Sequence, residues 1–170
     1  MTFESVSDRV KNGFRRLIHP IVDWIARSNL HPNIMTLISL GFCVVAGLFW
    51  AAGWLAAAGI VVLLGGWADI MDGMVARAQN RASTFGALFD SSLDRIAELF
   101  MFIGIGYFFA TSSQFDGWHG LTVILAALAF GASVMVSYVR ARAESLGYDC
   151  SVGILQRPER FILLALGSFF

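Results

Sequence analysis

Four apolar segments dominate the chain, and each is long enough to cross a lipid bilayer. They cover residues 34–50, 55–75, 85–110 and 121–139, where about 20 mostly apolar residues make a spanning helix. A fifth apolar segment begins at Phe161 and reaches the last residue, Phe170. We therefore predict an all-α integral membrane protein whose fifth membrane helix is cut short.

The composition agrees with this prediction. Hydrophobic residues make up 57% of the chain and charged residues only 14%, whereas about a quarter of a soluble globular domain is charged. The formal net charge is zero, so a general role in binding nucleic acid has no support.

The basic residues fall on one side of the predicted topology. The connectors at residues 51–54 and 111–120 contain no Lys or Arg, and Arg95 lies within the third segment. Basic residues in short loops stay on the cytoplasmic side, so we expect a multi-pass cell-membrane protein with a cytoplasmic N-terminus. The basic residues on that side include Arg9, Lys11, Arg15, Arg16, Arg27, Arg77, Arg81, Arg140, Arg142, Arg157 and Arg160.

The first 31 residues have a pattern of their own. Apolar residues such as Val6, Val10 and Phe14 recur at helical spacing, with basic residues mainly between them. This predicts an amphipathic helix that lies in the membrane interface; a helix packed on protein is the alternative. We thus divide the chain into an interfacial helix at 1–31 and a transmembrane domain at 32–170, incomplete at its C-terminal end.

Four aspartates lie within the apolar segments, where ionisable groups are costly and are functional candidates by default. Asp69 and Asp72 are in the second segment and Asp90 and Asp94 in the third. The helical period separates the first pair by about 60° and the second by about 40°, so each pair shares a face. Arg81, in the connector between the two segments, is equally far in sequence from Asp72 and from Asp90. We therefore expect the two pairs to lie at similar depth and to meet near the cytoplasmic third of the bilayer.

Four ionised carboxylates in a small apolar space would repel one another. Two divalent cations would balance their charge, and ligands that are all oxygen favour Mg²⁺ or Mn²⁺ over zinc. Two neighbouring metal ions suit chemistry at phosphorus. The alternative is a set of protonated or ion-paired acids that serve packing. Glu98, one turn after Asp94, either orients this cluster or is structural, for example by pairing with Arg95.

Two glycines and an arginine accompany the aspartates. Gly73 follows Asp72 directly, and Gly86 lies one turn before Asp90; the missing side chains let a ligand approach the backbone. Arg77 is one turn past Gly73, where its guanidinium can pair with a diphosphate or reach toward lipid headgroups.

The spacing of these residues resembles a known signature. Residues 69–94 read DIMDGMVARAQNRASTFGALFDSSLD and match all eight fixed positions of D-x2-D-G-x2-A-R-x8-G-x3-D-x3-D. This resembles the CDP-alcohol phosphatidyltransferase family. The segment LHPNIMT resembles the family's opening of the first span, although His31 stands where threonine is commoner. SYVRARAESLG (137–147) and QRPERFILL (156–164) resemble the phosphatidylinositol-phosphate synthase branch.

The resemblance implies a six-helix transmembrane bundle, here truncated in helix five, around a polar cavity open to the cytoplasm, and a homodimer. It implies that Asp69, Asp72, Asp90 and Asp94 bind two Mg²⁺ or Mn²⁺ ions and that Asp94 deprotonates the acceptor hydroxyl. Positions that the resemblance places near the CDP-lipid donor are Asn33, Thr36, Gly73, Ala76, Arg77, Ser83 and Gly86. The implied reaction transfers a phosphatidyl group from a CDP-diacylglycerol type of lipid to a polar alcohol and releases CMP.

The acceptor is predicted from a second group of arginines at the cytoplasmic ends of the later helices. Forked guanidinium donors suit a dianionic phosphate, which favours a phosphorylated polyol. The resemblance implies inositol phosphate, with Arg140, Arg157 and Arg160 as the acceptor-binding candidates. Positive-inside topology is the alternative explanation of these arginines, and glycerol 3-phosphate is the competing acceptor.

Two other functions use acids in membrane helices. A cation-coupled transporter does so, but it needs neither the Gly-x2-Ala-Arg spacing nor a second arginine group. A prenyltransferase also uses Mg²⁺ with aspartate-rich motifs, but the x8 interval and Gly86 fit it poorly.

Overall fold

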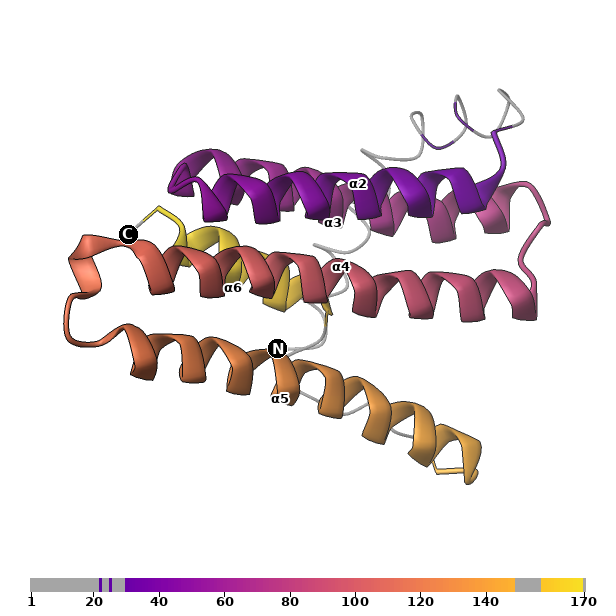
Figure 1. The fold of residues 1–170 in the computed structure, drawn as a ribbon. Helices are drawn as coiled ribbons and strands as arrows, with labels where there is room; N and C mark the ends of the chain where they lie inside the picture. Colours follow the sequence, from indigo (N-terminus) through magenta and orange to yellow (C-terminus); the bar gives the residue numbers. More distant parts are fainter. Residues whose placement is uncertain (1–21, 23–24, 26–29, 149–156, 170) are drawn as a thin grey trace, which may run out of the picture.

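The computed structural model describes residues 22, 25, 30–148 and 157–169. Every regular element in these ranges is helical, as predicted (Figure 1). The elements are α2 (Pro32–Ala51), α3 (Leu55–Ala78), α4 (Thr84–Thr111), the short 3₁₀ helix η1 (Ser113–Phe115), α5 (His119–Ser145) and α6 (Arg157–Gly167). The four long helices coincide with the four apolar segments of the sequence.

Three of the described helices, α2, α3 and α5, are long and apolar enough to cross a membrane. Helix α4 is the longest of the described helices at 28 residues, but Asp90, Asp94, Arg95 and Glu98 lower its hydropathy. Charged side chains in such a helix are tolerated when they face the interior of a bundle. Asp94 and Glu98 are buried accordingly.

The predicted interfacial helix at residues 1–31 lies almost entirely outside the described residues. Of this segment, Val22 is buried in a small cluster with Met35, Met71 and Val75. The part of the segment that the structure describes therefore contacts α2 and α3.

Helix boundaries follow from local chemistry. Pro32 occupies the first turn of α2 and the His31 side chain accepts a hydrogen bond from the Asn33 N–H at 3.2 Å, which satisfies one of the open donors of a helix start. Ser83 caps α4 in the same way, accepting from the Gly86 N–H at 3.0 Å. Between α3 and α4, Asn80 adopts a left-handed conformation with φ of 52°, which asparagine tolerates better than most residues.

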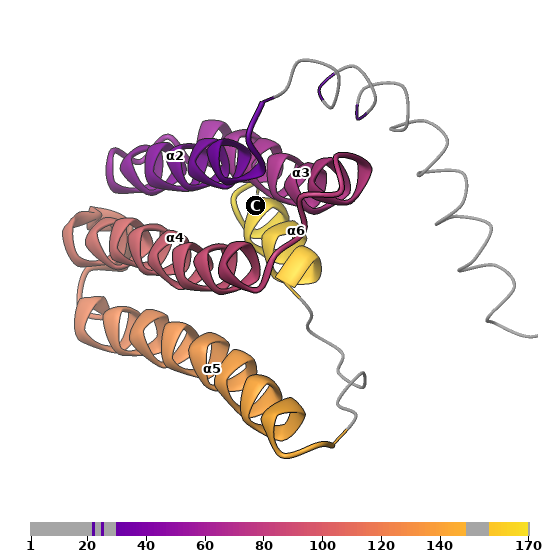
Figure 2. The ribbon, with the colours of Figure 1, turned by 90° about the vertical axis from the view of Figure 1, so that its right-hand side faces the viewer.

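Helix α2 packs against both α3 and α4, α6 packs on α3 and α5 packs on α4 (Figure 2). Helix α5 diverges from α4 toward its C-terminal end (Figure 1). The main core lies among α2, α3, α4 and α6 and consists of Cys43, Ala46, Trp50, Ala58, Val62, Ala97, Met101, Phe161 and Ala165.

A glycine pair sets the approach of α2 to α4. A Cβ on Gly104 would lie 2.0 Å from the carbonyl oxygen of Gly47, far inside van der Waals contact. Small residues allow this close backbone packing in membrane proteins, where dispersion contacts drive helix association. The contact fixes α4 beside α2 and so brings the start of each helix to the same end of the bundle.

Candidate metal centre and donor pocket

Three of the four aspartates meet between α3 and α4. One carboxylate oxygen from each of Asp69, Asp72 and Asp90 lies within 4.8 Å of the other two. Asp94 does not belong to this triplet; it is buried one turn further along α4, and its Oδ2 lies 3.4 Å from Nη1 of Arg95. The expected meeting of the two helical faces is thus seen for three carboxylates, with the fourth beside them.

The triplet fits a divalent cation. Oδ1 of Asp90 is buried and has no hydrogen-bond partner among the described residues, whereas Oδ2 of Asp72 accepts a 2.9 Å hydrogen bond from the Thr36 hydroxyl. A buried carboxylate oxygen without a donor is costly unless a charge or ligand faces it. Because the ligand atoms are all carboxylate oxygens, a hard cation of the Mg²⁺ or Mn²⁺ type suits them.

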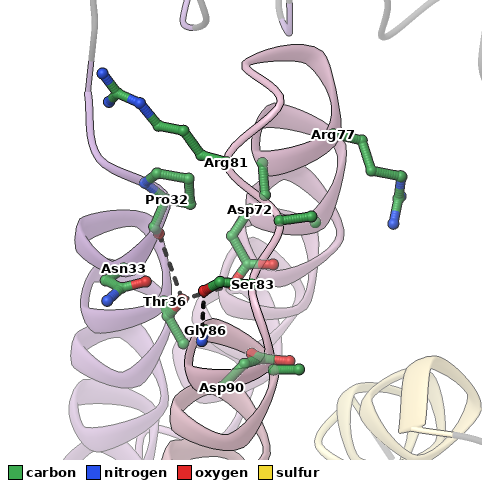
Figure 3. Close-up of a pocket in the computed structure, with 13 residues that line it drawn as sticks. Pro32, Asn33, Thr36, Asp72, Arg77, Arg81, Ser83, Gly86 and Asp90 are labelled. Carbon is green, nitrogen blue, oxygen red and sulfur yellow. Dashed lines mark hydrogen bonds between the residues drawn. The ribbon is translucent and has the colours of Figure 1, made fainter.

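A pocket of about 210 Å³ adjoins two of these carboxylates. It lies where the starts of α2 and α4 meet the end of α3 (Figure 3). Its walls are Pro32, Asn33, Thr36, Asp72, Gly73, Ala76, Arg77, Arg81, Ala82, Ser83, Gly86, Ala87 and Asp90. All seven residues that the sequence placed near the donor line this pocket.

Charges of both signs line the pocket. The Asp72 and Asp90 carboxylates lie between the helices, while the Arg77 and Arg81 side chains extend to opposite sides (Figure 3). The guanidinium of Arg77 lies over Gly73: a Cβ added at Gly73 would be 3.5 Å from Nη1 of Arg77. A diphosphate whose charge is shared by a cation and arginine donors is the kind of ligand that this pattern suits.

Arg81 is a pocket residue that the sequence analysis used only for topology. It stands in the variable x8 interval of the signature, so the motif did not mark it. The signal that could have identified Arg81 is its position as a basic side chain in a short connector beside the two helices that carry the aspartates.

The acceptor candidates are not gathered in this pocket. Arg140 is exposed and its Nε lies 3.0 Å from Glu144 Oε1 on the same helix. Nη1 of Arg160 lies 2.9 Å from Glu98 Oε1. Arg157 begins α6, and its side chain lies outside the described set. Glu98 therefore pairs with Arg160 and not with Arg95, whose Nη1 donates to the Ser91 carbonyl oxygen at 2.7 Å.

Comparison with known proteins gives the same family as the sequence signature. Residues 29–170 match the family model of the CDP-alcohol phosphatidyltransferases. The archaetidylinositol phosphate synthase of Methanothermobacter thermautotrophicus is 38% identical over 165 residues, covering 97% of this chain and 78% of that protein. The phosphatidylinositol phosphate synthase of Mycobacteroides abscessus is 32% identical over 159 residues, covering 92% of this chain and 70% of that protein.

Solved structures agree. Phosphatidylinositol phosphate synthase of Mycobacterium tuberculosis with CDP-DAG bound superposes with a TM-score of 0.77 at 30% identity, covering 90% of this chain and 75% of that one. The same enzyme in complex with manganese and citrate gives a TM-score of 0.76, covering 88% and 70%. The resemblance seen in the sequence signature is therefore confirmed: the chain belongs to the CDP-alcohol phosphatidyltransferase family of enzymes.

Proposed function

We propose that the chain transfers the phosphatidyl group, or its ether-lipid equivalent, from a CDP-lipid to inositol phosphate and releases CMP. The observation that carries this proposal is the pocket lined by the acids Asp72 and Asp90 together with Arg77 and Arg81. The Asp69 carboxylate lies beside the two acids. The names of the relatives support the acceptor, because the archaeal enzyme is an archaetidylinositol phosphate synthase and the bacterial enzyme a phosphatidylinositol phosphate synthase.

Different residues of the chain bind different parts of the CDP-lipid donor. Asp69, Asp72 and Asp90, with Asp94 beside them, hold two Mg²⁺ or Mn²⁺ ions. When bound, these ions supply charge neutralisation at the diphosphate. Arg77 adds forked donors to a diphosphate oxygen. Asn33, Thr36, Ala76, Ser83 and the two glycines, Gly73 and Gly86, form the walls around the CDP moiety.

Asp94 acts on the acceptor. Its carboxylate takes the proton from the acceptor hydroxyl, and the oxygen forms a bond to the lipid-side phosphorus. The bond from that phosphorus to the bridging oxygen breaks, and CMP leaves with the electron pair. A positioned base of this kind contributes roughly 100-fold to 10,000-fold to a rate.

The acceptor phosphate is held by Arg140, Arg157 and Arg160 at the cytoplasmic ends of α5 and α6. The remaining features belong to the same proposal. They are a cytoplasmic N-terminus and active site, an interfacial helix at 1–31, a transmembrane domain at 32–170 that belongs to a six-helix bundle, and a homodimer.

The test is a transfer assay in detergent with a radiolabelled CDP-lipid, once with CDP-diacylglycerol and once with its dialkyl ether counterpart. The acceptors are inositol phosphate, glycerol 3-phosphate, serine and free inositol, each with Mg²⁺ or Mn²⁺. The proposal predicts CMP and a labelled phospholipid with inositol phosphate only. A preference for glycerol 3-phosphate would contradict inositol phosphate as the acceptor and assign glycerol 3-phosphate instead. No CMP release with any acceptor and metal would favour a cation-coupled transporter.

A further inference from the structure

A buried ion pair outside the donor pocket joins α4 to α6. Oε1 of Glu98 lies 2.9 Å from Nη1 of Arg160, and the two side chains are only 6% and 18% exposed. Glu98 stands one turn after Asp94 on α4, and Arg160 stands one turn after Arg157, the first residue of α6. The pair therefore connects the part of α4 that carries Asp94 with the beginning of α6.

Helix α5 joins the same junction through two serines. The Ser133 hydroxyl donates to Glu98 Oε2 at 3.0 Å, while Arg160 Nη1 donates to the Ser133 carbonyl oxygen at 3.1 Å and Nη2 donates to the Ser137 hydroxyl at 3.3 Å. Ser133 is one of the two buried residues of α5. The junction thus fixes α5 in the region where it diverges from α4.

The surroundings of the ion pair make its geometry costly to change. Glu98, Ser133 and Arg160 line one wall of a pocket of about 300 Å³, whose other walls include Met101, Phe102 and several aliphatic side chains. Phe161, next to Arg160, is buried in the main core, and its ring lies over Gly66 of α3. Removing one partner of a buried pair leaves an uncompensated charge in apolar surroundings, so the paired arrangement is strongly favoured.

We infer that Glu98 is a positioning residue for the acceptor. By binding Arg160, its carboxylate holds the first turn of α6, and with it Arg157, at a fixed distance from the Asp94 base on α4. This inference rests on the proposed function, because it requires that the α6 arginines bind the acceptor phosphate. It assigns Glu98 no contact with substrate.

The first experiment separates this role from a packing role by kinetics. Glu98→Gln should raise the acceptor KM about tenfold and leave the donor KM within about twofold. Glu98→Asp keeps the charge on a shorter side chain, so it should restore part of the acceptor KM. The matched control is Asp116→Asn, which removes a carboxylate from an exposed contact with His119; exposed pairs contribute little, and both KM values should stay within about twofold.

A double-mutant cycle tests whether Glu98 acts through Arg160. The effects of Glu98→Gln and Arg160→Gln on the acceptor KM should not multiply, because both variants break the same contact. The double variant leaves no buried charge unpaired, so it remains testable if Glu98→Gln does not fold: its acceptor KM should equal that of Arg160→Gln alone, and Glu98→Asp should raise the acceptor KM less than the double variant does. Equal changes in donor and acceptor KM, or multiplying effects, would overturn the inference. The transfer assay of the wild type with the four acceptors tests the proposed function separately.

Discussion

The hydroxyl of Thr36 on α2 donates a 2.9 Å hydrogen bond to Oδ2 of Asp72 on α3. Both residues are buried and both line the donor pocket. A carboxylate oxygen of Asp72 also lies in the triplet with Asp69 and Asp90. Thr36 therefore orients a proposed metal ligand in addition to lining the pocket.

Replacing Thr36 by valine keeps the side-chain shape and removes this hydrogen bond. We expect the Mg²⁺ or Mn²⁺ concentration for half-maximal activity to rise about tenfold or more, as is typical when a partner of a metal ligand is lost. Ser39→Ala is the matched control, because Ser39 lies one turn on in α2 and its hydroxyl donates to the Gly65 carbonyl oxygen at 2.9 Å. Equal shifts in the two metal titrations would count against the assignment.

Asp94 is buried one turn beyond Asp90 on α4, next to the carboxylate triplet. Asp94→Asn should lower kcat by about 100-fold or more, since the amide cannot accept the hydroxyl proton. CDP-lipid binding, measured by equilibrium retention of the radiolabelled donor, should stay within about twofold. Turnover close to that of the wild type would remove Asp94 from the base role.

The close contact of α2 with α4 predicts a stability effect. Gly104→Ala would place a methyl group 2.0 Å from the Gly47 carbonyl oxygen, so the two helices must move apart, at a cost of about 1–3 kcal/mol or more. Gly106→Ala is the control on the same helix, because a Cβ there meets nothing within 4 Å. Thermal unfolding in detergent should show a lower Tm for Gly104→Ala only. An unchanged Tm for both variants would contradict the packing described here.

The sequence was sufficient for much of the fold and for the donor side of the site. Apolar length predicted the four long helices, and helical spacing put Asp69 and Asp72 on one face. It did not predict that Asp94 lies outside the triplet, because the spacing of Asp90 and Asp94 gives a shared face but not the tilt between α3 and α4.

Contacts between distant parts of the chain were beyond prediction. Spacing along one helix suggested Arg95 as a partner of Glu98, whereas the observed partner is Arg160 on α6. The approach of Gly47 to Gly104 was likewise invisible, because no periodic pattern within one helix identifies which faces of two helices will meet.

The α6 arginines give a kinetic prediction for the acceptor. Arg157→Ala should raise the KM for inositol phosphate about tenfold or more, because a charge-assisted hydrogen bond contributes roughly 1.5–3 kcal/mol. The donor KM should change little. Arg142→Ala is the control: Arg142 is an exposed arginine in the last turn of α5 and is not assigned to the acceptor. If both variants raise the two KM values alike, general attraction of anions by the basic surface explains the effect.

The central claim is that two neighbouring helices jointly hold divalent cations through the Asp69, Asp72 and Asp90 carboxylates. The most direct measurement is Mn²⁺ binding followed by electron paramagnetic resonance, for the wild type, Asp72→Asn on α3 and Asp90→Asn on α4. The account predicts saturable binding to the wild type and at least tenfold weaker binding to each variant, since each removes a ligand. Undiminished Mn²⁺ binding to both variants would contradict it.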